Sequence, residues 1–170
     1  PKAPVRVGGE TMVLRVARAL ATVVEEVVVV SPRVEPAAAA LRRVADRLPD
    51  RGPLGGLHAA LHEAQGLGLE GVLTVGCDLP LVTPELLGAV AAALPGARAA
   101  APVRDGLVEA VCAAWSVDVL EEVERRLEGS DLSLQALFEA VGGVRVEPGH
   151  GDAWRTALIN VNTPDDRERA

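Results

Sequence analysis

Two continuous runs of apolar residues constrain the fold of this chain more than any other feature. Residues 27–30 read Val-Val-Val-Val, and residues 72–75 read Val-Leu-Thr-Val. A strand with one solvated face alternates apolar and polar side chains, whereas a strand covered on both faces does not. Both runs therefore predict strands that lie within a sheet with helices on each side.

The segments around these runs carry the apolar spacing and the end signals of helices. Residues 83–85 read Thr-Pro-Glu, which combines an N-cap residue, a first-turn proline and a first-turn acid. We predict helices over residues 11–22, 37–43, 52–64, 83–94, 117–127, 132–141 and from 163 onward, and further strands over 43–45, 108–115, 144–146 and 158–159. This alternation predicts one α/β domain over residues 1–170. It would be an open, mostly parallel sheet with helices on both faces, in three α/β/α layers.

Composition excludes several classes of protein. The chain has 170 residues, 49% of them hydrophobic, and a formal net charge of −7. It is too apolar to be disordered, and it lacks the surplus of cations that a nucleic-acid surface needs. No apolar run approaches the roughly 18 residues of a membrane span, and the first residues carry no signal-peptide core. We expect a cytoplasmic protein with no nucleic-acid or membrane partner, in which Cys77 and Cys112 are buried thiols.

Asp78 is the first candidate for chemistry. It comes shortly after the apolar run 72–75, and ligands of open α/β sheets bind beyond the carboxyl ends of the strands. A carboxylate at that place can hold Mg²⁺ together with phosphate oxygens. It can equally cap the turn into Pro80 and the next helix, and its position alone does not decide between the two roles.

Two further features are suited to an anion. Residues 52–56 read Gly-Pro-Leu-Gly-Gly at a predicted helix start, where main-chain N–H groups can meet an anion or a base edge. Lys2 is the single lysine of the chain, and an ammonium group binds phosphate as a point charge. Short glycine-rich turns are common in proteins that bind no anion. A compositional bias toward arginine would also explain why the chain has a single lysine. The chain has no Walker A or dinucleotide glycine motif, which counts against a P-loop enzyme and a dinucleotide oxidoreductase.

The histidines and asparagines form two pairs. His58 and His62 lie one helical turn apart, which is metal-ligand spacing, but no third ligand is near in the sequence. We therefore expect them to lie on a solvated or half-buried helix face. Asn160 and Asn162 are the only asparagines, and on an extended segment their amides would face the same way, toward a polar heterocycle. An Asx turn that caps the following helix is the alternative for Asn162.

Taken in order, residues 1–3, 7–10, 46–56, 77–80 and 160–164 form one pattern. It resembles the molybdenum cofactor guanylyltransferases, the MobA family, within the sugar-nucleotide type of nucleotidyltransferases. The resemblance covers nearly the whole chain, and the Gly-Pro-Leu helix start together with the Asn-Val-Asn-Thr-Pro segment points to the MobA branch. It implies a Rossmann-like fold of the nucleotide-diphospho-sugar transferase type. It also implies Mg²⁺-dependent transfer of GMP from GTP to molybdopterin, with release of pyrophosphate.

The resemblance also implies roles for single residues. The signature lysine of the family falls on Lys2 and its Mg²⁺ aspartate on Asp78, so these two are the implied catalytic residues. The aspartate that contacts guanine falls on Asp46, next to the glycine turn. The implied GTP-binding residues are Lys2, Asp46, Gly52, Pro53, Leu54, Gly55 and Asp78, and the implied molybdopterin-binding residues are Asn160 and Asn162.

Two matters stay open at the level of sequence. Family members place a strand and a Leu-Ala-Gly-Gly loop ahead of the signature lysine, so we expect roughly 15 to 20 residues of strand and loop before Pro1. Other functions compatible with the pattern are a relative with another nucleotide or acceptor, such as a molybdopterin cytidylyltransferase or a sugar-phosphate nucleotidyltransferase, and a catalytically silent nucleotide-binding domain. A transient partner in cofactor delivery is also compatible with the resemblance.

Overall fold

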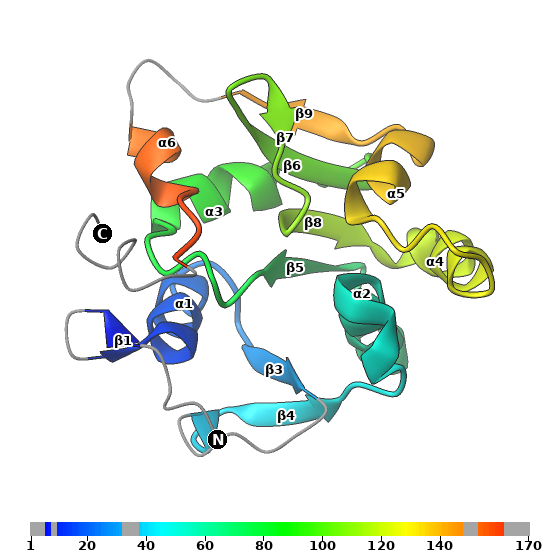
Figure 1. Ribbon diagram of the computed structural model, residues 1–170, viewed down its shortest axis with the longest axis horizontal. Coiled ribbons are helices and arrows are strands. Elements are labelled where there is room, and N and C mark those ends of the chain that lie inside the picture. The colour runs from blue at the N-terminus through cyan, green and yellow to red at the C-terminus, as the bar shows by residue number, and fades with distance from the viewer. Residues whose placement is uncertain (1–5, 8–9, 32–37, 148–152, 162–170) are drawn as a thin grey trace.

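Helices lie on both sides of a sheet in the computed structural model, which describes residues 6–7, 10–31, 38–147 and 153–161 (Figure 1). The helices are α1 (Met12–Leu20), α2 (Gly52–Gly66), α3 (Pro84–Ala92), α4 (Leu120–Leu127), α5 (Leu134–Ala140) and α6 (Ala153–Ala157), with short 3-10 helices at Pro49–Arg51 and Val117–Val119. The strands are β1 (Arg6–Val7), β2 (Glu10–Thr11), β3 (Val28–Ser31), β4 (Arg42–Ala45), β5 (Gly71–Val75), β6 (Ala99–Arg104), β7 (Leu107–Val108), β8 (Cys112–Ser116) and β9 (Val144–Val146). None of the described helices has both the length and the apolar composition of a membrane span.

Most of the helices predicted within the described residues are confirmed, and cap residues fix where two of them begin. The Thr83 hydroxyl accepts a hydrogen bond from the Leu86 N–H at 3.3 Å and starts α3, and the Ser133 hydroxyl accepts one from the Ala136 N–H at 3.2 Å and starts α5. The helix predicted over 37–43 is wrong, because pairing with β3 draws Arg42–Ala45 into strand β4. The helix predicted from 163 onward lies outside the described residues, and the strand predicted over 158–159 is wrong, because the N–H groups of Leu158 and Ile159 bond back to α6.

The five-stranded sheet is mixed: the predicted common direction holds for β5, β6 and β9, whereas β7 and β8 run against them. β3–β4 and β6–β9 are parallel, and β5–β8, β6–β8 and β6–β7 are antiparallel. The cause lies at Asp105 and Gly106, whose φ angles of 54° and 80° close a tight hairpin between β6 and β7. The chain therefore reverses direction just before the strand predicted over 108–115. That segment then runs antiparallel to β6 as β7 and β8, which residues 109–111 separate.

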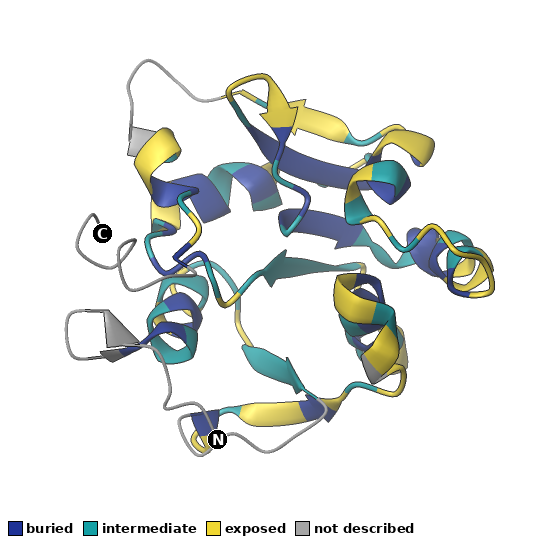
Figure 2. Ribbon diagram, in the orientation of Figure 1, coloured by how far each residue is buried: buried dark blue, intermediate teal, exposed yellow. Residues whose placement is uncertain are grey.

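Alternate side chains of β8 enter two different cores, which confirms the three α/β/α layers. Ala113 and Trp115 pack in one core with residues of α2, α4 and α5, and Cys112 and Ala114 pack in the other with residues of α1, α3 and α6. Figure 1 shows these two groups of helices on opposite sides of the sheet. Strands β6 and β8 are buried between them (Figure 2).

The strands β3 and β5 are less buried than their apolar sequences predicted. In the part of the chain that the structure describes, β3 pairs only with β4 and β5 only with β8. Every residue of both strands is half-buried (Figure 2). Each of these strands has only one neighbour among the described strands, so its other edge keeps contact with solvent. Neither strand is therefore completely buried.

Candidate functional site

The segment after β5 holds Asp78 in a tight turn. The Gly76 N–H donates to the Val111 carbonyl at 3.0 Å, and the Leu79 N–H donates to the Gly76 carbonyl at 3.1 Å. A side chain at Gly76 would collide with Asp78 Oδ1, so the glycine allows the half-buried carboxylate to lie close over the main chain. Leu79 is buried and anchors the turn in the core.

The structure excludes one of the two roles considered for Asp78. The N-terminus of α3 is capped by Thr83, not by Asp78. Among the described residues, the Asp78 carboxylate accepts no hydrogen bond. The helix cap is therefore excluded as its role, and its oxygens are available to a ligand.

The C-terminal segment meets Asp78 directly. The Val161 N–H donates to the main-chain carbonyl of Asp78 at 2.8 Å. Val161 is 2% exposed and packs against Met12, whereas Asn160 beside it is exposed. The fold thus brings the first asparagine of the predicted pair next to the predicted Mg²⁺ aspartate, and Asn162 lies outside the described residues.

Asp46 follows β4 and is held by its own loop. Its Oδ1 atom accepts a hydrogen bond from the Leu48 N–H at 2.9 Å, which fixes the orientation of the half-buried carboxylate. A carboxylate has about four acceptor positions. One bond from the main chain therefore leaves both oxygens able to accept from a ligand.

The glycine turn after Asp46 has two structural requirements of its own. Gly52 has a φ of +57°, in the left-handed region, and a Cβ at Gly55 would lie 2.5 Å from the Leu48 carbonyl oxygen. Gly55 therefore lets α2 approach the loop that carries Asp46. Pro53 is exposed in the first turn, but Leu54 is 0% exposed in the core. Of the predicted GTP-binding residues, Leu54 could thus meet a ligand only through its main chain.

The predicted site residues form two groups. Asp78 is joined to the segment of Asn160, and the loop that carries Asp46 meets α2 where Leu48 lies against Gly55. Within the described part of the chain, no hydrogen bond or ion pair links Asp46 to Asp78. Lys2 lies outside the described residues, so its place relative to either group stays a prediction.

The cysteines differ from each other, and the expectation for one of them is wrong. Cys77 is exposed because it lies in the turn beyond β5, whereas Cys112 is buried in the sheet as expected. Burial raises the pKa of the Cys112 thiol to about 12, so that thiol stays neutral at neutral pH.

Comparison with known proteins gives this arrangement a context. Residues 1–144 match the profile of the MobA-like NTP transferase domain. A protein of Opitutus terrae named "probable molybdenum cofactor guanylyltransferase" is 30% identical over 174 residues, which cover 99% of this chain and 85% of that protein. The molybdenum cofactor guanylyltransferase of Cereibacter sphaeroides is 32% identical over 172 residues, with 99% and 86% of the two chains covered.

A solved structure shows the same fold. The crystal structure of molybdopterin-guanine dinucleotide biosynthesis protein A from Archaeoglobus fulgidus matches with a TM-score of 0.79 over 99% of this chain and 87% of that chain. Its sequence is 21% identical to this one. The predicted α/β class and nucleotidyltransferase type of fold are therefore confirmed.

Proposed function

This chain belongs to the MobA-like NTP transferase family, and on that premise we propose that it transfers GMP from GTP to molybdopterin and releases pyrophosphate. The observation that carries the proposal is the 2.8 Å hydrogen bond from Val161 to the Asp78 carbonyl. It joins the segment proposed to bind the acceptor to the residue proposed to hold the metal of the nucleotide. A transferase needs its two substrates side by side, so this junction supports transfer between them.

We assign recognition of the nucleotide base to the Asp46 carboxylate. Guanine presents N–H donors at N1 and N2, and a carboxylate accepts both, whereas adenine lacks this pair of donors. The Leu48 N–H holds the Asp46 carboxylate in place before the nucleotide arrives. Gly52 and Gly55 shape the adjoining turn, and main-chain N–H groups at the start of α2 can face the nucleotide.

Asp78 fits the chemistry of a Mg²⁺ ligand. Mg²⁺ prefers one or two carboxylates together with phosphate oxygens and waters. Asp78 is half-buried beyond the end of β5 and supplies such a carboxylate, with no hydrogen bond to it from the described residues. When bound there, the ion would neutralise phosphate charge. Lys2 is proposed to neutralise phosphate charge as well, through its ammonium group.

The proposed reaction needs little help from proton transfer. The attacking group is the phosphate of molybdopterin, which is already ionised at neutral pH, so no strong general base is required. The work of the protein is to hold the two substrates in line and to balance their negative charge. Asp46, Asp78 and Asn160 are suited to this positioning role.

The test is a turnover assay with molybdopterin and each of GTP, CTP and ATP, read by pyrophosphate release and by the mass of the dinucleotide. We expect the GMP adduct of molybdopterin and at least about tenfold slower turnover with the other nucleotides. Preference for CTP would instead indicate a cytidylyltransferase. Nucleotide binding without any product would indicate a catalytically silent domain.

The acceptor side is tested by replacing Asn160→Ala together with Asn162→Ala. Each lost hydrogen-bonding group costs on the order of 1 to 3 kcal/mol, so molybdopterin affinity should fall about 10- to 100-fold per residue. GTP affinity should stay as in the parent. The melting temperature is measured first, and unchanged molybdopterin affinity in a folded variant would overturn the assignment.

A further inference from the structure

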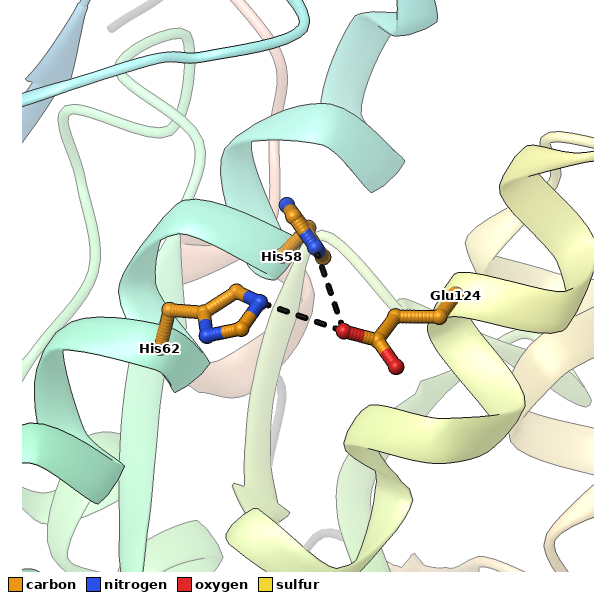
Figure 3. A group of neighbouring side chains, drawn as sticks. All are labelled: His58, His62 and Glu124. Carbon is orange, nitrogen blue, oxygen red and sulfur yellow. Dashed lines mark ion pairs between the residues drawn. The ribbon is translucent and has the colours of Figure 1, made fainter.

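Three potential metal ligands converge between α2 and α4, and none of them is among the residues assigned to the reaction. Figure 3 shows His58 and His62 of α2 and Glu124 of α4 turned toward one another. His62 Nε2 lies 3.2 Å and His58 Nε2 3.8 Å from the same oxygen, Glu124 Oε1. Their ligating atoms all lie within 4.8 Å of one another.

These separations match those of ligands around one small ion. Zinc binds imidazole nitrogen at about 2.0 to 2.1 Å and carboxylate oxygen at about 2.0 to 2.2 Å, which places neighbouring ligands of a tetrahedron about 3.4 Å apart. The measured 3.2 and 3.8 Å lie on either side of this spacing. Small rotations of the three side chains therefore suffice to bring them to one ion.

The burial of the cluster also suits a metal. His58 is the most buried of the three residues. Its side chain is 11% exposed, against 33% for His62 and 50% for Glu124, so the cluster opens to solvent at the carboxylate. The ring atom His58 Nδ1 is buried without a hydrogen-bond partner among the described residues.

Other charges around the cluster are of both signs. Arg47, in the loop after β4, is a cation whose charge is felt at His58 and opposes a bound cation. Glu63, the neighbour of His62 on α2, forms an ion pair with Arg42 of β4, so its charge is already balanced. Glu124 is then the carboxylate of this cluster that is positioned to balance a cation.

We propose that His58, His62 and Glu124 form a binding site for a divalent transition metal of the zinc type. Two imidazoles and one carboxylate are a ligand set for zinc, with the fourth position left to water. The ion would fasten α2 to α4, two helices that share one hydrophobic core. The sequence predicted a plain helix face because Glu124 lies far along the chain from the two histidines.

This site is independent of the proposed transfer reaction. Its nitrogen ligands favour zinc, nickel or copper, whereas the carboxylate at Asp78 suits Mg²⁺. The experiment therefore uses no nucleotide. Untagged, metal-free protein is titrated with Zn²⁺ by calorimetry and with Co²⁺ by visible absorption, in which tetrahedral Co²⁺ gives much stronger bands than octahedral Co²⁺. A Cys77→Ser background removes the exposed thiol as an alternative ligand.

We expect one Zn²⁺ per chain, the strong visible bands of four-coordinate Co²⁺, and a higher melting temperature with Zn²⁺. Replacing Glu124→Gln or His62→Gln should weaken Zn²⁺ binding by about 100-fold or more, since even the partners of metal ligands cost about 10- to 100-fold. Glu121→Gln, an exposed change on the same helix, should leave binding unchanged. Equal Zn²⁺ affinity in the parent and in both folded ligand variants would overturn the proposal, as would binding that disappears with Cys77→Ser alone.

Discussion

Asp46 and Asp78 are both aspartates that follow a strand, and their different surroundings support the two different tasks proposed for them. The Asp46 carboxylate is oriented by the Leu48 N–H, as suits a group that recognises one base by direction. The Asp78 carboxylate has no such donor among the described residues and lies over Gly76. No donor from the described residues therefore competes with a cation for the Asp78 oxygens.

At this scale we expect Asp78→Asn to keep the fold and to lose Mg²⁺-dependent turnover by about 100-fold or more. The amide has nearly the same shape but carries no charge for a metal. The measurement is the rate of GMP transfer across a Mg²⁺ titration. Asp118→Asn, an exposed change after β8, is the matched control. Turnover of D78N at the parent rate would exclude Asp78 as the metal ligand.

Two neighbouring glycines of α2, Gly55 and Gly56, differ in the space that a side chain would find. A Cβ at Gly55 would lie 2.5 Å from the Leu48 carbonyl oxygen, whereas nothing lies within 4 Å of one at Gly56. Gly55→Ala should therefore destabilise the protein by about 1 to 3 kcal/mol and weaken GTP binding, because the Asp46 loop must move. Gly56→Ala should stabilise it by about 0.5 to 1 kcal/mol through helix propensity. Urea unfolding of both variants tests this, and equal effects would contradict it.

At the scale of the element, α4 carries an ion-pair network centred on Glu122. Arg125 and Arg126 both donate to Glu122, and Arg126 reaches Asp131 at 2.9 Å. Hydrogen bonds from Arg125, then from Arg126, lower the pKa of Glu122 from about 4.5 to about 2. The folded state thus favours the ionised carboxylate, and this stabilisation is present above about pH 4.5 and is lost as the pH falls toward about 2.

Glu122→Gln should therefore lower the free energy of unfolding near pH 7 by up to about 1 kcal/mol, since Arg125 is exposed and the pairs are screened. The difference from the parent should shrink as the pH falls below about 4.5. Urea unfolding at pH 7 and pH 3 measures it, with Glu121→Gln as the control. A difference that is constant with pH would show that the pairs contribute nothing.

Elements with local signals were predictable from the sequence, and elements made by tertiary contacts were not. α3 begins at the predicted Thr83 cap and α2 at the predicted glycine turn. β6 was missed because it begins with three alanines, which have low strand propensity, and its alanines are 0% exposed where helices cover both faces. The Asp105-Gly106 pair that closes the β6–β7 hairpin is a local signal that could have located it.

At the scale of the whole molecule, the sequence pattern predicted the three layers and the common direction of β5, β6 and β9, but neither the order of the strands nor the reversed direction of β7 and β8. Apolar runs predict burial, and β8 alternates between the two cores as a covered strand does. The junction of Val161 with Asp78 and the approach of Glu124 to the histidines depend on how distant segments pack. The roles of single residues in the reaction came from family resemblance and stay proposals.

The proposed function requires that the protein prefer guanine nucleotide, and calorimetric titration of the protein with GTP and with ATP, each with Mg²⁺, measures this preference. We expect GTP to bind at least about tenfold more tightly, since ATP leaves the Asp46 carboxylate without its donors. Asp46→Asn keeps an oxygen for the Leu48 N–H and should reduce that preference without unfolding the protein. Equal affinity of the parent protein for GTP and ATP would contradict the account.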